Sequence, residues 1–169
     1  MSRIIVRAAS VALACVTALV LTPVGNAGAT SLTYFTVRAA WGWQNTGVHI
    51  RGGQEYSVSY QRGSWTVDGA RFSRVDADGY SNRTDASIVH GCKIIANRPY
   101  GTLIAKRGGG AFPVGKFGKY TAGYSGWLSL RINDGDFCLS DNAGSILVSI
   151  QVYDKKQSSG GGNGGNKVG

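Results

Sequence analysis

The sequence predicts an all-β fold, a small jelly-roll-like β-sandwich that forms one domain. Three segments alternate apolar and polar residues with the period of two that half-buried strands show: 56–60, 128–132 and 146–152. Five further short strand candidates lie at 34–38, 48–51, 65–67, 101–106 and 119–122. Glycine-containing turns, Arg62-Gly63 among them, separate these segments, and no 11-residue window after residue 29 holds a capped helical stripe. Many short strands with frequent glycine turns favour a sandwich.

The first 29 residues have the pattern of a secretory signal peptide. Arg3 and Arg7 precede an apolar run over residues 8–21, and Ala27-Gly28-Ala29 supplies the small residues of a cleavage site. The run is too short to span a membrane as a helix, and no later apolar stretch approaches that length. We therefore expect cleavage after Ala29 and a secreted, extracellular protein without a membrane span.

Two parts of the remaining chain carry little strand pattern. Residues 69–99 are long, polar and weakly patterned, which predicts one or two extended loops across an end of the sandwich. Residues 158–169 are mostly glycine, serine and asparagine and have almost nothing to bury, which is typical of a disordered tail. The predicted sandwich domain therefore covers residues 30–157.

The charge balance is basic but gives no specific partner. The chain has 18 Lys and Arg against 9 Asp and Glu, a formal net charge of +9 at pH 7. The basic residues are scattered along the sequence, and no nucleic-acid-binding motif is present. We expect loose attraction to anionic surfaces and no nucleic-acid partner.

Two cysteines remain after the predicted signal peptide, which contains Cys15. In an exported protein, the pair Cys92 and Cys138 most simply predicts one disulfide, and two buried free thiols are the alternative. The closed loop would stabilise the fold by up to about 4 kcal/mol in the chain-entropy description.

The densest polar cluster lies between the last two confident strands, at residues 133–145. Five of its side chains carry carboxylate or amide oxygens: Asn133, Asp134, Asp136, Asp141 and Asn142. Calcium takes six to eight oxygen ligands of this kind, so a strand-to-strand loop with these residues is a candidate calcium site. The cluster lacks the glycine, the glutamate and the flanking helices of an EF-hand. An ordinary Asx-rich hairpin loop explains the composition equally well.

The loop sequence N-D-x(6)-D-N-x-G-S, followed by an alternating strand, resembles that of the PA-IL-like bacterial galactophilic lectins. Residues 63–68 are similar to that family's tryptophan-containing strand and the turn after it. Residues 101–106 are similar to its G-A-L-x-x-K strand. The segments 114–118 and 125–130 are similar to its later strands.

This resemblance covers residues 37–152 and implies a calcium-dependent lectin whose sugar, a galactose-type one, binds directly to Ca²⁺ at one end of a sandwich. Asp134, Asp141 and Asn142 match side-chain ligands, with Asp141 standing where the family has asparagine. Asp68 and Cys138 match positions that contribute backbone carbonyls, which leaves the sulfur of Cys138 available to Cys92. The resemblance also allows a homo-oligomer.

The sugar-contacting side departs from the family pattern. Asp134, Gly135 and Asp141 are the expected sugar contacts next to the ion. The family supplies a histidine and a glutamine from the loop before its G-A-L strand, but residues 85–100 have a different length and no clear counterpart. His90 and Asp85 are the nearest candidates, so the sugar preference is open.

The four tryptophans have two possible roles. Trp41, Trp43 and Trp127 are either faces for stacking on sugar rings or packing residues, and Trp65 is predicted to lie in the core. A glycan-active enzyme is disfavoured because there is a single glutamate, Glu55, and no G-x-S-x-G motif, so no catalytic residues are predicted. A secreted inhibitor or toxin-like domain that acts through protein contacts is the remaining alternative.

Overall fold

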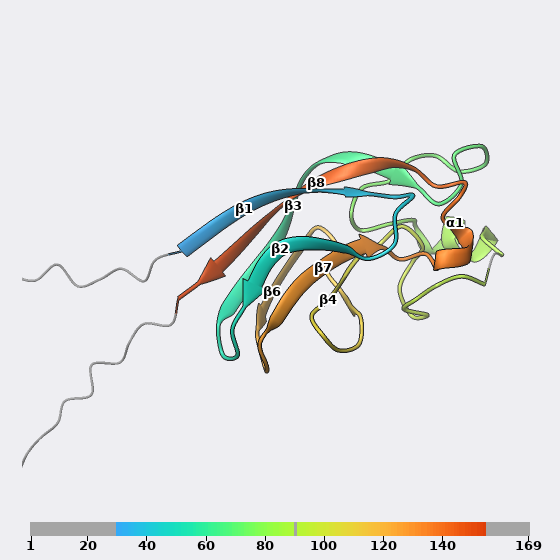
Figure 1. Ribbon diagram of the computed structural model, residues 1–169. Coiled ribbons are helices and arrows are strands. Elements are labelled where there is room, and N and C mark those ends of the chain that lie inside the picture. The colour runs from blue at the N-terminus through green and yellow to red at the C-terminus, as the bar shows by residue number, and fades with distance from the viewer. Residues whose placement is uncertain (1–29, 90, 155–169) are drawn as a thin grey trace, which may run out of the picture.

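Two four-stranded antiparallel sheets form the fold in the computed structural model, which describes residues 30–89 and 91–154. The first sheet has the order β1-β8-β3-β6 and consists of Thr30–Arg38, Ala143–Tyr153, Glu55–Thr66 and Phe117–Thr121. The second has the order β2-β7-β4-β5 and consists of Gln44–Ile50, Gly126–Ile132, Leu103–Lys106 and Phe112–Pro113. The sheets lie over one another (Figure 1), which confirms the predicted β-sandwich.

The core lies between the two sheets, where the predicted alternation places it. On β8 the side chains of Ile146, Val148, Ile150 and Val152 are buried, and the residues between them are only partly so. On β7 the inward residues are Leu128, Leu130 and Ile132, all fully buried. Burying one such side chain stabilises the fold by about 1.5–3 kcal/mol, so this register is strongly fixed.

Trp65 is fully buried, as predicted, at the end of β3. Its indole Nε1–H donates to the carbonyl of Gly101 at 2.8 Å, so the single polar atom of the side chain is satisfied. This contact connects the end of β3 to the segment just before β4 and helps to close the sandwich at the end where the long loops lie.

One predicted turn is wrong, because β3 runs without interruption through Arg62-Gly63. The register against β8 shifts between Tyr60 and Arg62, and Gly63 follows with a φ of 102°. A Cβ on Gly63 would lie 2.4 Å from the carbonyl oxygen of Ser145, so the close approach of β8 requires glycine here. The glycine thus marks an irregularity within one strand rather than a turn between two.

The expectation of loops without helix over residues 69–99 is also wrong in part. A short helix, α1, spans Asn82–Ser87. Ser81 is its N-cap and accepts a hydrogen bond from the backbone N–H of Thr84 at 3.3 Å, while Asp85 lies in the first turn, where a negative charge is favourable. The helix is too short and too exposed to show an apolar stripe in the sequence.

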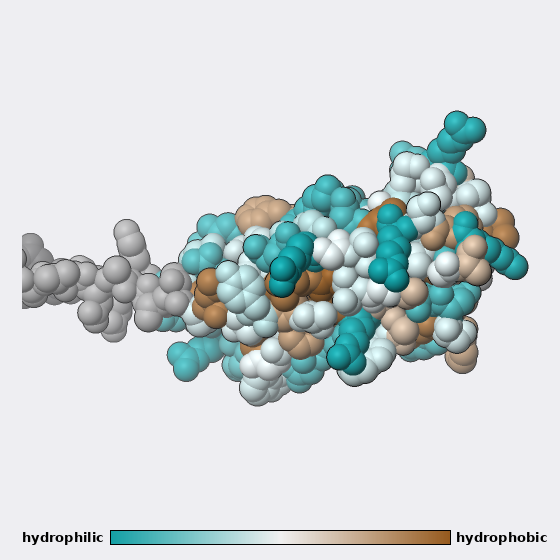
Figure 2. Space-filling model, turned by 90° about the horizontal axis from the view of Figure 1, so that it is seen from above, coloured by the Kyte–Doolittle hydropathy of each residue, from teal (hydrophilic) through white to brown (hydrophobic). Residues whose placement is uncertain are grey.

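Most long connections meet at one end of the sandwich. Helix α1 and the 3₁₀ helix η1 (Asp136–Cys138) both lie there, whereas the start of β1 and the end of β8 lie at the opposite end (Figure 1). Seen from above, the surface mixes hydrophilic and hydrophobic side chains along its length (Figure 2). No helix within residues 30–89 and 91–154 has the length and apolar character needed to cross a membrane. The predicted signal peptide and tail lie outside the described residues.

Candidate functional site

The polar loop between β7 and β8 separates its oxygen-bearing side chains into two groups. Asn133 and Asp134 are fully buried, and Asn142 is 7% exposed. Asp136 and Asp141 lie at the surface. A loop that merely turned between two strands would expose most of these groups to water, so the buried group is the part that needs a chemical explanation.

Asp134 is fixed by its own backbone and by a buried cation. Its N–H donates to the carbonyl of Ile132 at 2.9 Å, and its carboxylate Oδ1 accepts from the N–H of Gly135 at 3.0 Å. The backbone carbonyl of Asp134 accepts from Nη2 of Arg131, a guanidinium that is only 1% exposed. Arg131 also donates from Nη1 to Asp136 at 2.6 Å. The position of the Asp134 carboxylate is therefore set at the end of β7, as a rigid ligand requires.

Asn142 presents a buried acceptor from the other end of the same loop. Its Nδ2 donates to the carbonyl of Ala39 at 3.2 Å, which fixes the orientation of the amide. Its Oδ1 is buried and accepts no hydrogen bond from any residue in the described part of the chain. A buried carbonyl oxygen in that condition costs about 1–3 kcal/mol unless a ligand or water satisfies it.

Asp68 lies directly after β3 and adjoins this loop. The N–H of Gly69 donates to the carbonyl of Asp141 at 2.8 Å, which joins the two segments. However, the backbone carbonyl of Asp68 already accepts from Thr66 Oγ1 at 2.9 Å and from the N–H of Phe72 at 3.1 Å. The carboxylate of Asp68 accepts from two further backbone N–H groups. The predicted role of this carbonyl as a calcium ligand stays a prediction, and these hydrogen bonds would compete with it.

A buried tyrosine, Tyr80, lies beneath the same region. Its hydroxyl is 2.8 Å from Thr66 Oγ1. Burial raises the pKa of Tyr80, and the negative charges of Asp68 and Asp134 raise it further, so both carboxylates lie close enough to act on this phenol.

The predicted disulfide is present between Cys92 and Cys138, whose Cα atoms are 6.4 Å apart. It connects the segment after α1 to η1, and the Asp134 carboxylate lies within 4.8 Å of both sulfurs. Sulfurs bonded to each other offer no thiolate, so this group is not a soft-metal site. Cys138 itself is held in η1 by the hydrogen bond from its N–H to the carbonyl of Gly135 at 3.0 Å.

Gly135 has room for no side chain. A Cβ there would lie 2.8 Å from the carbonyl oxygen of Cys92, so the loop from residue 85 to residue 100 passes directly over it. The sequence predicted Gly135 as a sugar contact because of its place beside Asp134. The structure adds that its absent side chain lets the two loops meet.

Asp85, a predicted sugar contact, makes two strong contacts within its own loop. One carboxylate oxygen accepts from the N–H of Tyr100 at 2.7 Å, and the other pairs with the Lys93 ammonium at 2.5 Å. The Tyr100 hydroxyl in turn accepts from the N–H of Cys92 at 2.7 Å. Asp85 therefore organises the loop, and its contact with a sugar stays a prediction. His90 lies outside the described residues.

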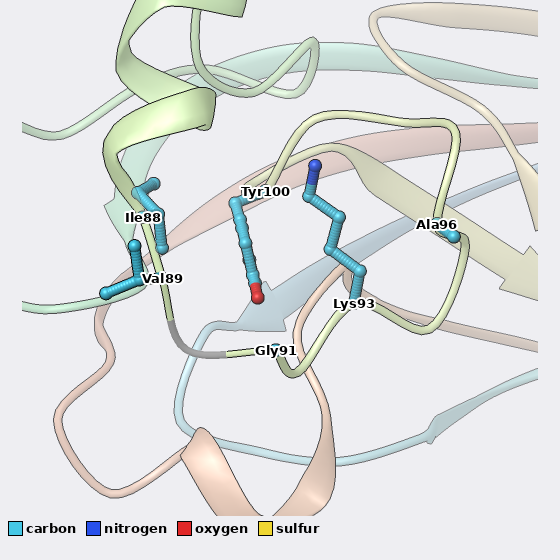
Figure 3. A pocket seen from close by; sticks show the side chains of 6 residues that line it. All are labelled: Ile88, Val89, Gly91, Lys93, Ala96 and Tyr100. Carbon is cyan, nitrogen blue, oxygen red and sulfur yellow. The ribbon is translucent and has the colours of Figure 1, made fainter.

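The same loop borders a pocket of about 450 Å³. Figure 3 shows the ring of Tyr100 between Ile88 and Val89 on one side and the side chain of Lys93 on the other, above Gly91. Apart from Lys93, which is paired with Asp85, the lining residues are apolar or aromatic. The pocket is held against the calcium-candidate loop by the disulfide.

Asn133 has a central structural role that the sequence did not predict. The sequence indicated it only as one of the five oxygen-bearing side chains of the loop. Its Oδ1 accepts from the N–H groups of Ile94 and Ile95 at 3.1 and 2.9 Å, and its Nδ2 lies 3.1 Å from three carbonyl oxygens, those of Ile95, Arg98 and Pro99. One buried amide thus holds the second half of the 85–100 loop. Its partners are 34 to 39 residues away, so no local sequence signal could have identified them.

A solved structure described as "EclA N-terminal domain; PllA-like lectin" is similar to this chain. The TM-score is 0.53 with 24% sequence identity, and the match covers 72% of this chain and 95% of that chain. The resemblance noted in the sequence is therefore confirmed at the level of the fold. No protein-family model and no curated protein matches the chain.

Proposed function

We propose that this protein is a secreted lectin that binds a carbohydrate through calcium held in the loop between β7 and β8. The observation that carries the proposal is the buried Oδ1 of Asn142, which accepts no hydrogen bond from the described residues. It lies in the same loop as the buried carboxylate of Asp134. One amide oxygen and one carboxylate, both hard ligands and both fixed, suit calcium better than any softer metal.

The donor set fits calcium at these two side chains. Asp134 supplies a full negative charge, and Asn142 supplies a neutral oxygen whose direction is set by the hydrogen bond to Ala39. Asp141 is exposed at the rim of the loop, where it is accessible to solvent and ligand. The backbone carbonyl of Cys138 is the further ligand that the resemblance implies, and that of Asp68 would have to share its oxygen with the turn.

Bound calcium would offer open coordination positions to two neighbouring sugar hydroxyls. The chain's own contribution would be to select which hydroxyl stereochemistry fits, through Gly135, Asp141 and the adjacent 85–100 loop. A galactose-type sugar is the specific ligand that we propose, and the solved domain of the same fold is described as a PllA-like lectin. We infer binding rather than catalysis.

A glycan array, read with calcium and again with a chelator, tests the proposal. Wild-type protein should retain galactose-type glycans in calcium and lose them in chelator. Asn142→Ala should lose them in both conditions while keeping its fold, since removing one hydrogen bond lowers the free energy of unfolding by only about 1 kcal/mol. The matched control is Asn82→Ala, an exposed asparagine at the start of α1.

Two results would contradict the proposal in different ways. Glycan binding that survives both the chelator and Asn142→Ala would show that calcium is not the bridge. An array on which wild-type protein retains no glycan in calcium would show that the protein is not a lectin of this kind.

A further inference from the structure

A second cleft, lying between the two edge strands β1 and β2, shares no residue with the loops described above. Its volume is about 480 Å³, and its principal lining residues are Phe35, Thr36, Arg38, Trp41, Trp43 and Gln44. Strand β1 is an edge of the first sheet and β2 an edge of the second, so the cleft opens along the side of the sandwich. The calcium proposal makes no use of it.

Two tryptophans of the β1–β2 turn give this cleft an aromatic wall. The side chain of Trp41 is 52% exposed, which is unusual for so large an apolar group, and Trp43 is partly buried beside it. The guanidinium of Arg38 lies 4.3 Å from the centre of the Trp41 ring. The ammonium of Lys106 lies 4.6 Å from the centre of the Trp43 ring, and the Arg131 guanidinium lies 5.4 Å from it. Aromatic faces and cations thus converge on one small surface.

The turn that carries these tryptophans is held rigid by Gln44, which is 8% exposed. Its Oε1 accepts from the N–H of Arg38 at 2.9 Å, and its Nε2 donates to the carbonyl of Arg38 at 3.0 Å. The carbonyls of Gly42 and Trp41 lie 3.4 and 3.5 Å from the same nitrogen. A surface that is already ordered loses little conformational entropy when a ligand binds, so this ordered turn is better suited to binding than a mobile one would be.

The two cations that lie over these tryptophans, Arg38 and Lys106, have no acidic partner among the described residues. Neither Arg38 nor Lys106 forms an ion pair with any acidic residue in the described ranges. The carboxylate beside Gly42 is that of Asp136, and it is engaged by the Arg131 guanidinium at 2.6 Å. Arg38 and Lys106 therefore carry positive charge at this cleft that no ion pair within residues 30–89 and 91–154 neutralises.

We propose that this cleft is a second ligand site, which takes an acidic saccharide: a sugar ring that bears a carboxylate. The apolar C–H face of the ring would stack on Trp41 and Trp43, and the carboxylate would lie against the Arg38 guanidinium, which can form two parallel hydrogen bonds to it. No residue of the calcium-candidate loop takes part. Binding at this cleft is therefore independent of calcium and does not depend on the lectin mechanism proposed above.

The test is an NMR titration of the full chain in chelator, which follows the indole Nε1–H signals of the four tryptophans. The probe is methyl β-D-glucuronide, and methyl β-D-glucoside is its neutral match. The acid should shift the Trp41 and Trp43 signals saturably at millimolar concentration and leave those of Trp65 and Trp127 in place. The neutral glycoside should bind about fivefold more weakly than the acid, the factor expected for one exposed charge pair.

Two variants and one control sharpen the outcome. Arg38→Gln should weaken binding of the acid about fivefold, bringing it to the level of the neutral glycoside. Trp41→Ala should abolish the Trp43 shift. Trp127→Ala, which removes an equally exposed tryptophan from β7, should leave the titration unchanged.

Three results would overturn the proposal. The first is the absence of any saturable shift at Trp41 and Trp43. The second is equal affinity for the acid and the neutral glycoside, which would remove the role of the charge. The third is movement of these signals on dilution of the protein alone, which would show that a second copy of the chain covers the cleft.

Discussion

The replacement Asn133→Ala should destabilise the protein more than its small change in side-chain volume suggests. The buried amide lies within hydrogen-bonding distance of two N–H groups and three carbonyls of the 94–99 segment. An amide can satisfy about four of these five, and each contributes about 1 kcal/mol net. Some of the freed backbone groups would regain water, so we expect the free energy of unfolding to fall by about 3 kcal/mol, a Tm lower by about 10 °C.

Thermal unfolding measures the global effect, and hydrogen exchange locates it. The amides of Ile94 and Ile95, which donate to Asn133, should exchange faster in the variant, while those of β8 should change only as much as global stability does. The matched control is Asn45→Ala, an exposed asparagine whose side chain accepts the N–H of Gly47 at 2.9 Å, with an expected change below about 0.5 kcal/mol. Equal effects of the two replacements would refute the role given to Asn133.

Two further predictions concern the disulfide and the response to alkali. Replacing Cys92 and Cys138 together by serine should lower the free energy of unfolding by up to about 4 kcal/mol. Native protein that is alkylated without reductant should show no labelled thiol by mass spectrometry. Two labelled thiols would contradict the pairing. Burial raises the pKa of Tyr120 to about 12 from its ordinary value of 10.0, so between these pH values the unfolded chain loses a proton that the folded chain keeps. The stabilisation that Tyr120 contributes is fully present below pH 10, so the free energy of unfolding should fall as the pH rises towards 12. Denaturant unfolding of Tyr120→Phe should show a smaller fall over the same range. An equal fall in the two proteins would show that Tyr120 does not cause it.

The strands were predictable because burial imposes a period of two on the sequence. Ile146, Val148 and Ile150 alternate with less buried neighbours, and β8 follows that pattern. Gly63 was predicted to lie in a turn because the sequence does not distinguish a turn glycine from a glycine that a close strand contact requires. Only the position of the Ser145 carbonyl, 2.4 Å from a Cβ on Gly63, distinguishes the two cases.

The sequence predicts which residue types make up the candidate site, but not which of their side chains are buried. The cluster from residue 133 to residue 142 identifies where oxygen ligands gather, and the cysteine count identifies the disulfide that supports them. Contacts made far along the chain hold the buried side chains: Asn133 bonds to the 94–99 segment and Asn142 to the carbonyl of Ala39. Tertiary contacts thus determine which polar side chains are buried, and such contacts leave no periodic signal in the sequence.

Calorimetric titration with calcium of wild type, Asp134→Asn and Asp154→Asn tests the central claim most directly. Wild type should bind calcium, and Asp134→Asn should bind it at least about tenfold more weakly, because the shape is kept while the one buried ligand charge is lost. Asp154→Asn, which removes an exposed charge just after β8 and away from the loop, should keep its affinity within about threefold. If wild type takes up no calcium at millimolar concentration, or if both variants bind as it does, the loop is an Asx-rich turn and the calcium-dependent lectin mechanism is wrong.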